Sequence, residues 1–257
     1  MQNNVNAVFE QREKTGQPMI PHLNHPNFGW AVTAEDLMQV NRERFFEVYN
    51  GHPTVHNEGD ETHASADRIW DIILTKRLTE LHLEPLYGLA TDDSHHYHVM
   101  GAGKNNPGQG WVQVRAEKLS PEKIIAAMEA GEFYASNGVR LKEVRREKEN
   151  YSIEIEPENG VTYTVQFIGT RKGFDGKSEP IRNASGAPLP VTHRYSKEIG
   201  VVLSEMKGTS ASYVLKGDEI YVRAKIISSK IKPALGKELE TAWTQPFVTE
   251  EKKAPVN

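Results

Sequence analysis

The 257-residue chain has no cysteine, no long hydrophobic run and no excess of positive charge. Without cysteine it cannot form disulfides, thiolate zinc sites or cysteine-ligated iron–sulfur clusters. No stretch approaches the roughly 18 apolar residues of a membrane helix, and no basic segment followed by an apolar one predicts a signal peptide. The 31 basic and 35 acidic residues give a net charge of −4, which argues against a general nucleic-acid binder. We therefore expect neither a membrane nor a nucleic acid as a partner.

The ten histidines are unevenly distributed along the chain. Only His193 lies beyond residue 98, so the sequence predicts a histidine-based site in the N-terminal part. Because cysteine is absent, any metal there must be held by imidazole and carboxylate groups, which suit zinc, manganese and iron. The other nine histidines are His22, His25, His52, His56, His63, His82, His95, His96 and His98.

The first 139 residues alternate between strand and helix patterns, which is typical of an α/β fold. Thr33, Ser65 and Ser120 stand at helix starts as N-cap residues, and Pro121 follows Ser120 at the first helical position. Gly131 is placed to end the last of these helices. The predicted helices are 1–17, 33–44, 66–74 and 120–131, and the predicted strands are a short one within 18–28, then 45–49, 85–90 and 111–116.

After residue 139 the pattern changes to short alternating strands, which predicts a small all-β, sandwich-like domain. An Asn-Gly turn within 157–160 joins the first two strands as a hairpin. The sequence therefore predicts an α/β domain over 1–139, a β domain over 140–249 and a disordered tail over 250–257. The four tryptophans are expected in the core. The predicted strands are 151–156, 161–168, 200–204, 211–215 and 219–227, with a long loop over 171–192.

The strongest chemical pattern is the segment Thr91–His98, which follows a strand. Asp93 and His95 are two residues apart, so both can point into one site as metal ligands. Asp92 could hold a ligand histidine from behind, and His96 could serve as a similar support or contact a substrate. A solvated polar loop is the alternative reading of this histidine-rich segment.

Two further candidates come from neighbouring strand ends. His25 is followed by Pro26, which favours an extended backbone at the histidine. In the same α/β unit as Asp93 and His95, it becomes a candidate third ligand. Glu47 lies in an apolar strand and needs a partner for its carboxylate; it either supports the metal site or forms a salt bridge at the strand end.

Several ordered segments resemble PHP-domain (polymerase and histidinol phosphatase) metal-dependent phosphoesterases. The resemblance is closest to a branch that carries a C-terminal β domain and includes carbamate-ester hydrolases. It covers most of residues 15–247. The segments are NHPNFGW at 24–30, FFEVYNG at 45–51, RIWDIILT at 68–75, YGLATDDSHHY at 87–97, PGQGWVQVRA at 107–116, GEFYASNGV at 131–139, YVLKGDEIYVRAKIISSK at 213–230 and AWTQPF at 242–247.

The resemblance implies a distorted (β/α)7 barrel, similar to a TIM barrel, with divalent metals at the C-terminal ends of its strands. It implies His25, Asp93 and His95 as ligands of zinc, manganese or iron, with Asp93 and His95 as catalytic residues. Glu47 and Asn50 match a motif near that site. The metals would activate a water for attack on a small phosphoester or related ester, and Asp93 would help to orient that water.

The sequence departs from the family at its opening motif, because no His-x-Asp-x-His pattern occurs in it. Residues 1–138 would then correspond to the second half of a barrel. We expect the first half to come from self-association or from a further N-terminal segment. The alternative is a non-catalytic protein whose β domain binds a carbohydrate or a protein.

Overall fold

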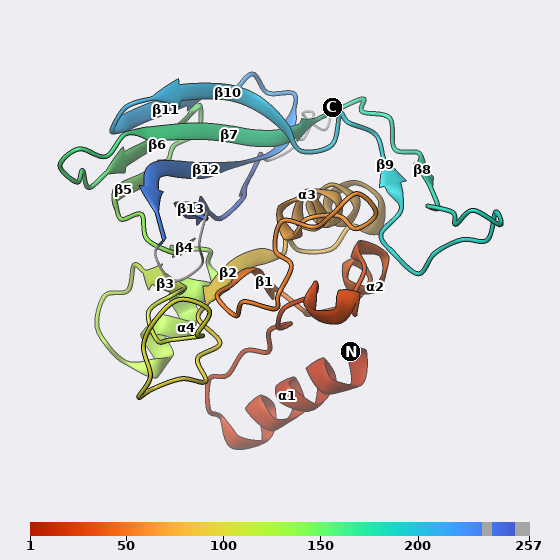
Figure 1. The fold of residues 1–257 in the computed structure, drawn as a ribbon, viewed down its shortest axis with the longest axis horizontal. Helices are drawn as coiled ribbons and strands as arrows, with labels where there is room; N and C mark the ends of the chain where they lie inside the picture. Colours follow the sequence, from red (N-terminus) through yellow and green to blue (C-terminus); the bar gives the residue numbers. More distant parts are fainter. Residues whose placement is uncertain (233–237, 250–257) are drawn as a thin grey trace, which may run out of the picture.

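The structure is a computed structural model that describes residues 1–232 and 238–249 (Figure 1). It shows a mixed α/β protein in which most strands pair antiparallel and helices are few. The strands within these two ranges form no closed barrel. No helix in this part of the chain is long and apolar enough to span a membrane. The tail predicted to be disordered, 250–257, lies outside the described residues.

The helices begin where the sequence places their caps. Thr33 and Asp36 form a capping box, and the hydroxyls of Ser65 and Ser120 each accept a backbone N–H of the first helical turn. The helix predicted over 33–44 is shorter in the structure, because it ends at Met38 with Gln39 as its C-cap. Arg42, with a φ of 64°, could not belong to a right-handed helix. The helices are α1 (Gln2–Thr15), α2 (Ala34–Met38), α3 (Ala66–Lys76) and α4 (Pro121–Glu129), with short helical turns η1 (Phe28–Trp30) and η2 (Arg77–Leu81).

A parallel pair of strands, β1 (Phe45–Asn50) and β2 (Tyr87–Thr91), forms the centre of the N-terminal part. Every residue of β1 is buried, as its run of aromatic and β-branched side chains predicts. The strand predicted within 18–28 is reduced to one bridge, between Leu23 and Phe46. Because the two strands are parallel, Asn50 and Thr91 lie side by side at their carboxyl ends.

A seven-stranded sheet extends from this part into the C-terminal part. Its order is β10-β7-β12-β13-β4-β3, and β14 pairs with β12. Strands on both sides of residue 139 therefore belong to one sheet, because β13 pairs with β4. The strands are β3 (Trp111–Val114), β4 (Phe133–Ser136), β7 (Tyr163–Arg171), β10 (Val201–Lys207), β12 (Glu219–Ile231), β13 (Leu239–Thr244) and β14 (Phe247–Val248).

A three-stranded antiparallel sheet packs against the large one and makes a two-layered β sandwich. Tyr151 and Ile153 from the small sheet pack in the same core as Phe167 and Ala224 from the large sheet. Their alternation along each strand is the period-two pattern that the sequence shows. The small sheet is β11-β6-β5, formed by β5 (Leu141–Arg146), β6 (Asn150–Ile155) and β11 (Ser210–Val214), and the pair β8 (Ser178–Glu179) and β9 (Arg194–Tyr195) lies apart from it.

A buried ionic contact joins α3 to the large sheet. Asp71 accepts hydrogen bonds from Arg223 Nε at 2.8 Å, Arg223 Nη2 at 2.7 Å and Tyr221 Oη at 2.8 Å. Burial disfavours the charged form of Arg223, yet the carboxylates of Asp71 and Asp67 raise its pKa above the ordinary value. The N-terminal part and the β sandwich are therefore held together by paired charges as well as by a shared apolar core.

Nearby, a side chain takes the place of a strand beside β2. The amide of Gln245 donates to the carbonyl of Gly88 at 2.8 Å and accepts the Gly88 N–H at 2.9 Å. Both backbone groups of Gly88 are thereby satisfied where no strand pairs with them. This contact fixes the position of β2 relative to the end of β13.

Candidate functional site

The carboxylate of Glu47 connects the polar groups at the carboxyl ends of β1 and β2. Its Oε2 accepts the backbone N–H of His25 at 2.7 Å and Nδ2 of Asn50 at 2.8 Å. Its Oε1 accepts the hydroxyl of Thr91 at 2.9 Å, and His22 Nε2 lies 3.7 Å away. Glu47 is thus a buried hydrogen-bond acceptor that positions the His25 backbone, Asn50 and Thr91.

The pKa of Glu47 follows from this environment. Burial acts to raise the pKa of the carboxyl group, since the side chain is only 4% exposed. The interactions with His22, Asn50, the His25 backbone and Thr91 together outweigh burial and lower the pKa below its ordinary value. The group is therefore an ionised carboxylate at neutral pH, and its negative charge lies beside the predicted metal ligands.

Asp93 and His95, which the sequence pattern predicts to point into one site, lie in contact with each other. His95 Nε2 lies 3.2 Å from Asp93 Oδ1, and Asn50 Nδ2 lies 3.3 Å from the other oxygen, Asp93 Oδ2. The His95 side chain is 64% exposed and that of Asp93 28%. Two donors suited to a divalent cation thus lie side by side and accessible from solvent, while Asn50 joins them to Glu47.

His25 reaches this cluster through its backbone. Its N–H binds Glu47, and its imidazole packs edge-on against Phe28 with 5.2 Å between ring centroids. The extended backbone predicted from Pro26 is wrong, because His25 has a φ of 25°. The hydrogen bond to Glu47 holds this conformation against the local preference. The role of the imidazole as a third ligand stays a prediction.

Backbone strain occurs at two of the three predicted ligands. Within the described chain only five residues other than glycine have positive φ, and they include His25 at 25° and Asp93 at 48°. Such conformations cost about 1–3 kcal/mol each and persist where surrounding contacts hold them. Here the contacts are those of Glu47 and Asn50. Strain of this kind is often found at functional sites, which supports a functional reading of this cluster.

The loop 104–110 holds the segment Asp92–His96 from behind. The backbone carbonyl of Asn105 accepts the N–H groups of His95 at 3.0 Å and His96 at 3.1 Å. The side-chain amide of Asn105 donates to the carbonyl of Asp93 at 3.0 Å. Asp92 accepts the N–H of Gly108 at 2.8 Å. His96 Nδ1 hydrogen-bonds the side chain of Asn105. Asp92 and His96 therefore anchor the segment to the loop.

Three residues of this arrangement were not among the predicted site residues. Thr91 and Asn105 supply hydrogen bonds, and the ring of His52 lies 5.5 Å from that of His95, centroid to centroid. His52 Nδ1 accepts the backbone N–H of Thr54 at 3.3 Å. The paired asparagines in the turn-rich loop 104–110 were the sequence signal for Asn105. No spacing rule links His52 to His95.

The donor chemistry at Asp93 and His95 fits a divalent cation, because carboxylate oxygen and imidazole nitrogen are ordinary ligands of such ions. Within the described residues, no group of three or more His, Asp or Glu side chains is arranged to hold a metal. No protein-family model matches this chain, and a search of curated proteins gives no match. The family resemblance therefore remains a proposal.

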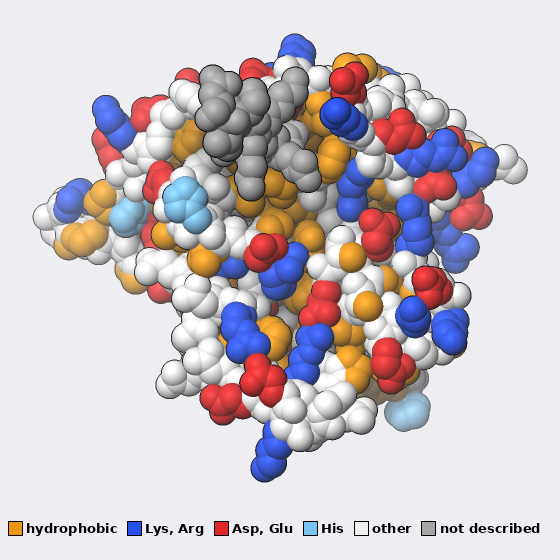
Figure 2. All heavy atoms as spheres, turned by 180° about the vertical axis from the view of Figure 1, so that it is seen from behind, with side chains coloured by type: hydrophobic (Ala, Val, Ile, Leu, Met, Phe, Trp, Pro, Cys, Tyr) orange, Lys and Arg blue, Asp and Glu red, His pale blue; other side chains and the backbone are white. Residues whose placement is uncertain are grey.

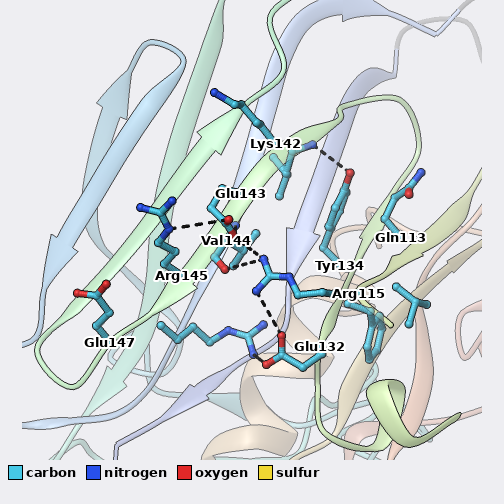
Figure 3. A pocket seen from close by; sticks show the side chains of 13 residues that line it. Gln113, Arg115, Glu132, Tyr134, Lys142, Glu143, Val144, Arg145 and Glu147 are labelled. Carbon is cyan, nitrogen blue, oxygen red and sulfur yellow. Dashed lines mark hydrogen bonds and ion pairs between the residues drawn. The ribbon is translucent and has the colours of Figure 1, made fainter. Parts of the chain in front are cut away.

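Away from this cluster, a groove of about 480 Å³ lies between β3, β4 and β5 (Figure 3). Arg115 reaches across it to Glu143 and lies 3.5 Å from Glu132, while Arg146 lies 4.0 Å from Glu132. The charges in this groove thus pair largely with one another. On the face shown in Figure 2, acidic and basic side chains are likewise intermixed.

Proposed function

We propose that this protein is a metal-dependent hydrolase of the PHP type, acting on a phosphoester or a related ester such as a carbamate. The observation that supports it most is the Asp93–His95 pair, accessible at the carboxyl ends of two parallel strands and joined through Asn50 to a buried carboxylate. Parallel α/β folds commonly place their reactive groups at this end of the strands.

In this proposal Asp93 and His95 bind a divalent ion, with His25 as the third ligand. A bound ion would supply a water of lowered pKa and polarise the ester oxygen. Glu47 holds the His25 backbone and the Asn50 amide, and Asn50 in turn orients Asp93. The loop 104–110 fixes the backbone on either side of both ligands, so their separation is set before a substrate arrives.

The finer fold assignment belongs to the same proposal. The parallel pair β1–β2, the bridge at Leu23 and the approach of Gly110 to Thr91 are the parts of the structure that resemble a barrel segment. We propose that they correspond to part of a distorted (β/α)7 barrel, completed by a second copy of the chain or by another segment. Such completion would add ligands to the three named here.

The direct test is metal binding followed by hydrolysis. The purified protein is freed of metal with a chelator and titrated with Mn²⁺ or Zn²⁺ in a calorimeter, and turnover of an aryl phosphodiester and an aryl carbamate is then measured. We expect saturable binding that Asp93→Asn and His95→Gln each abolish, and metal-dependent turnover. His82 is an exposed histidine that directly follows η2. His82→Gln is therefore the matched control and should bind as the parent does.

Two results would contradict the proposal. One is a parent protein that binds neither ion, and the other is binding that survives both substitutions. Sedimentation measured alongside shows whether the chain self-associates. If a second copy completes the site, activity should also rise more steeply than protein concentration.

A further inference from the structure

Trp30 stacks on two histidines of the loop that joins β1 to α3. Its indole lies nearly parallel to the imidazole of His63, with 3.9 Å between ring centroids and 9° between the planes. The imidazole of His56 stacks on the same indole at 4.7 Å and 17°. Trp30 ends η1, five residues after His25, whereas both histidines belong to loop 52–64. The stack therefore joins the segment after His25 to the loop after β1.

The backbone of Trp30 is strained where the two segments meet. Its φ of 56° is unfavourable for a residue with a side chain. Such a conformation persists where surrounding contacts hold it. Here the stack is joined by Asn27, which is 3% exposed and donates through Nδ2 to the carbonyls of His56 at 2.9 Å and Ala64 at 3.0 Å. A change that weakens the stack therefore removes one of the contacts that hold the strained backbone.

A carboxylate lies at the edge of the His63 ring. His63 Nδ1 is 2.8 Å from Asp60 Oδ1 and 2.9 Å from Asp60 Oδ2. The same Oδ1 accepts the backbone N–H groups of His63 and Thr62, each at 2.7 Å. These hydrogen bonds, that of the His63 backbone first, lower the pKa of Asp60 below its ordinary value. Asp60 is therefore ionised throughout the range in which an imidazole titrates.

The elements packed around Trp30 and His63 contribute uncharged side chains to this contact. Glu58 and Glu61 lie on the same loop as exposed side chains, so Asp60 is the carboxylate at hydrogen-bond distance from His63. A cation over the face of an indole is attracted by its π electrons. A protonated His63 gains that attraction and a charge pair, whereas a neutral one keeps the stacking contact alone. The uncharged neighbours are Val32, Thr33, Ile69, Val191 and Thr192.

Loop 52–64 also contacts the candidate site. Asn57 Oδ1 accepts the backbone N–H of Asn50 at 3.0 Å, and Asn57 Nδ2 donates to the Asn50 carbonyl at 2.8 Å. Asn50 is the residue whose side chain lies between Glu47 and Asp93. The position of the loop is thereby connected to the residues at the carboxyl end of β1.

We propose that loop 52–64 is a pH-sensitive strap beside the candidate site, which tightens when His56 and His63 are protonated and loosens when they lose their protons. An imidazole changes charge between about pH 5 and pH 8. Because the charged form is the one that the stack and Asp60 favour, their hold on the loop is strongest at acid pH and weakens as the pH rises through that range. The strap rests on its own contacts and does not depend on the proposed hydrolase activity.

The test is hydrogen exchange of loop 52–64 in the whole chain, followed by mass spectrometry at pH 5.5 and pH 7.5. Each variant is compared with the parent at the same pH, so that intrinsic exchange rates cancel. Trp30→Leu should speed exchange of the loop, by a factor about two- to fivefold larger at pH 5.5 than at pH 7.5. His63→Gln should show the same trend. In a chain that carries both His56→Gln and His63→Gln, adding Trp30→Leu should have the same effect at both pH values.

Two variants and one reference segment serve as controls. His82→Gln changes an exposed histidine outside the loop and should leave loop exchange as in the parent. Asp60→Asn keeps the indole in place and should reduce the pH dependence through an exposed position. Exchange of α4 in every variant reports on overall stability, which separates a loosened loop from a folding defect.

Three results would overturn the proposal. The first is an effect of Trp30→Leu that is equal at the two pH values or larger at pH 7.5. The second is loop exchange that Trp30→Leu leaves unchanged at pH 5.5. The third is a pH-dependent effect of Trp30→Leu that persists when both histidines are replaced.

Discussion

Lys232 makes a measurable prediction about how stability depends on pH. The lysine is buried at 6% exposure and its pKa is lowered from 10.5 to about 8. Below pH 8 the amine is protonated in both folded and unfolded protein, so the full cost of burying an ammonium group is present. Between the two pKa values the unfolded chain still binds this proton and the folded chain does not. Stability contributed by this group therefore rises with pH.

The magnitude follows from the same shift. A difference of about 2.5 pKa units corresponds to about 3 kcal/mol over the complete titration. Over the practical range from pH 7 to pH 9.5, the linkage relation gives about 2 kcal/mol. Lys232→Met removes this titration and keeps an unbranched chain of similar length. We expect the free energy of unfolding of the parent, relative to the variant, to increase by about 2 kcal/mol across this range.

Urea unfolding followed by circular dichroism at several pH values measures this difference. Subtracting the variant cancels every other titrating group, and Lys172→Met, at an exposed lysine, is the matched control. A parent-to-variant difference that stays flat or falls between pH 7 and pH 9.5 would refute the reasoning, because it would mean that the folded protein holds the proton as tightly as the unfolded chain.

Three other substitutions test the packing around the site by the same unfolding assay. Asp71→Asn leaves Asp67, 3.0 Å from Arg223, as the carboxylate that pairs with the buried arginine, and should cost about 1–3 kcal/mol; an unchanged stability would show that Asp67 and water suffice for the arginine. Glu47→Gln places an N–H group where the carboxylate accepts hydrogen bonds and should cost about 1–3 kcal/mol and shift the His25 amide resonance. Gly88→Ala puts a Cβ 2.9 Å from Trp70 and should cost about 1–3 kcal/mol, whereas an unchanged midpoint would mean that the indole moves aside.

Local features of the fold were predictable because they depend on neighbouring residues alone. Short segments of sequence are enough to predict the helix caps at Thr33, Ser65 and Ser120 and the buried strand at 45–49. The structure confirms these predictions. The sharing of one sheet across residue 139 was not predictable, since it depends on pairing between β4 and β13, over a hundred residues apart. Periodicity identifies a strand and says nothing about its partner. The domain boundary at 139 stays a prediction, and the shared sheet crosses it.

The candidate site shows the same division. Asp93 and His95 are two residues apart, so their contact follows from the sequence once a strand end is recognised. The placement of Asn50 between Glu47 and Asp93 requires two parallel strands to end together. The backbone of His25 could not be predicted, because a distant carboxylate overrides the preference set by Pro26.

The sheet that continues across residue 139 also determines how the protein unfolds. Neither part can lose its structure alone without exposing strand edges and uncovering the buried pair of Asp71 and Arg223. Heating should therefore give a single calorimetric peak whose van't Hoff and calorimetric enthalpies agree. The amides of β4 and β13 should exchange with solvent only through that global event, although they belong to segments far apart in the chain.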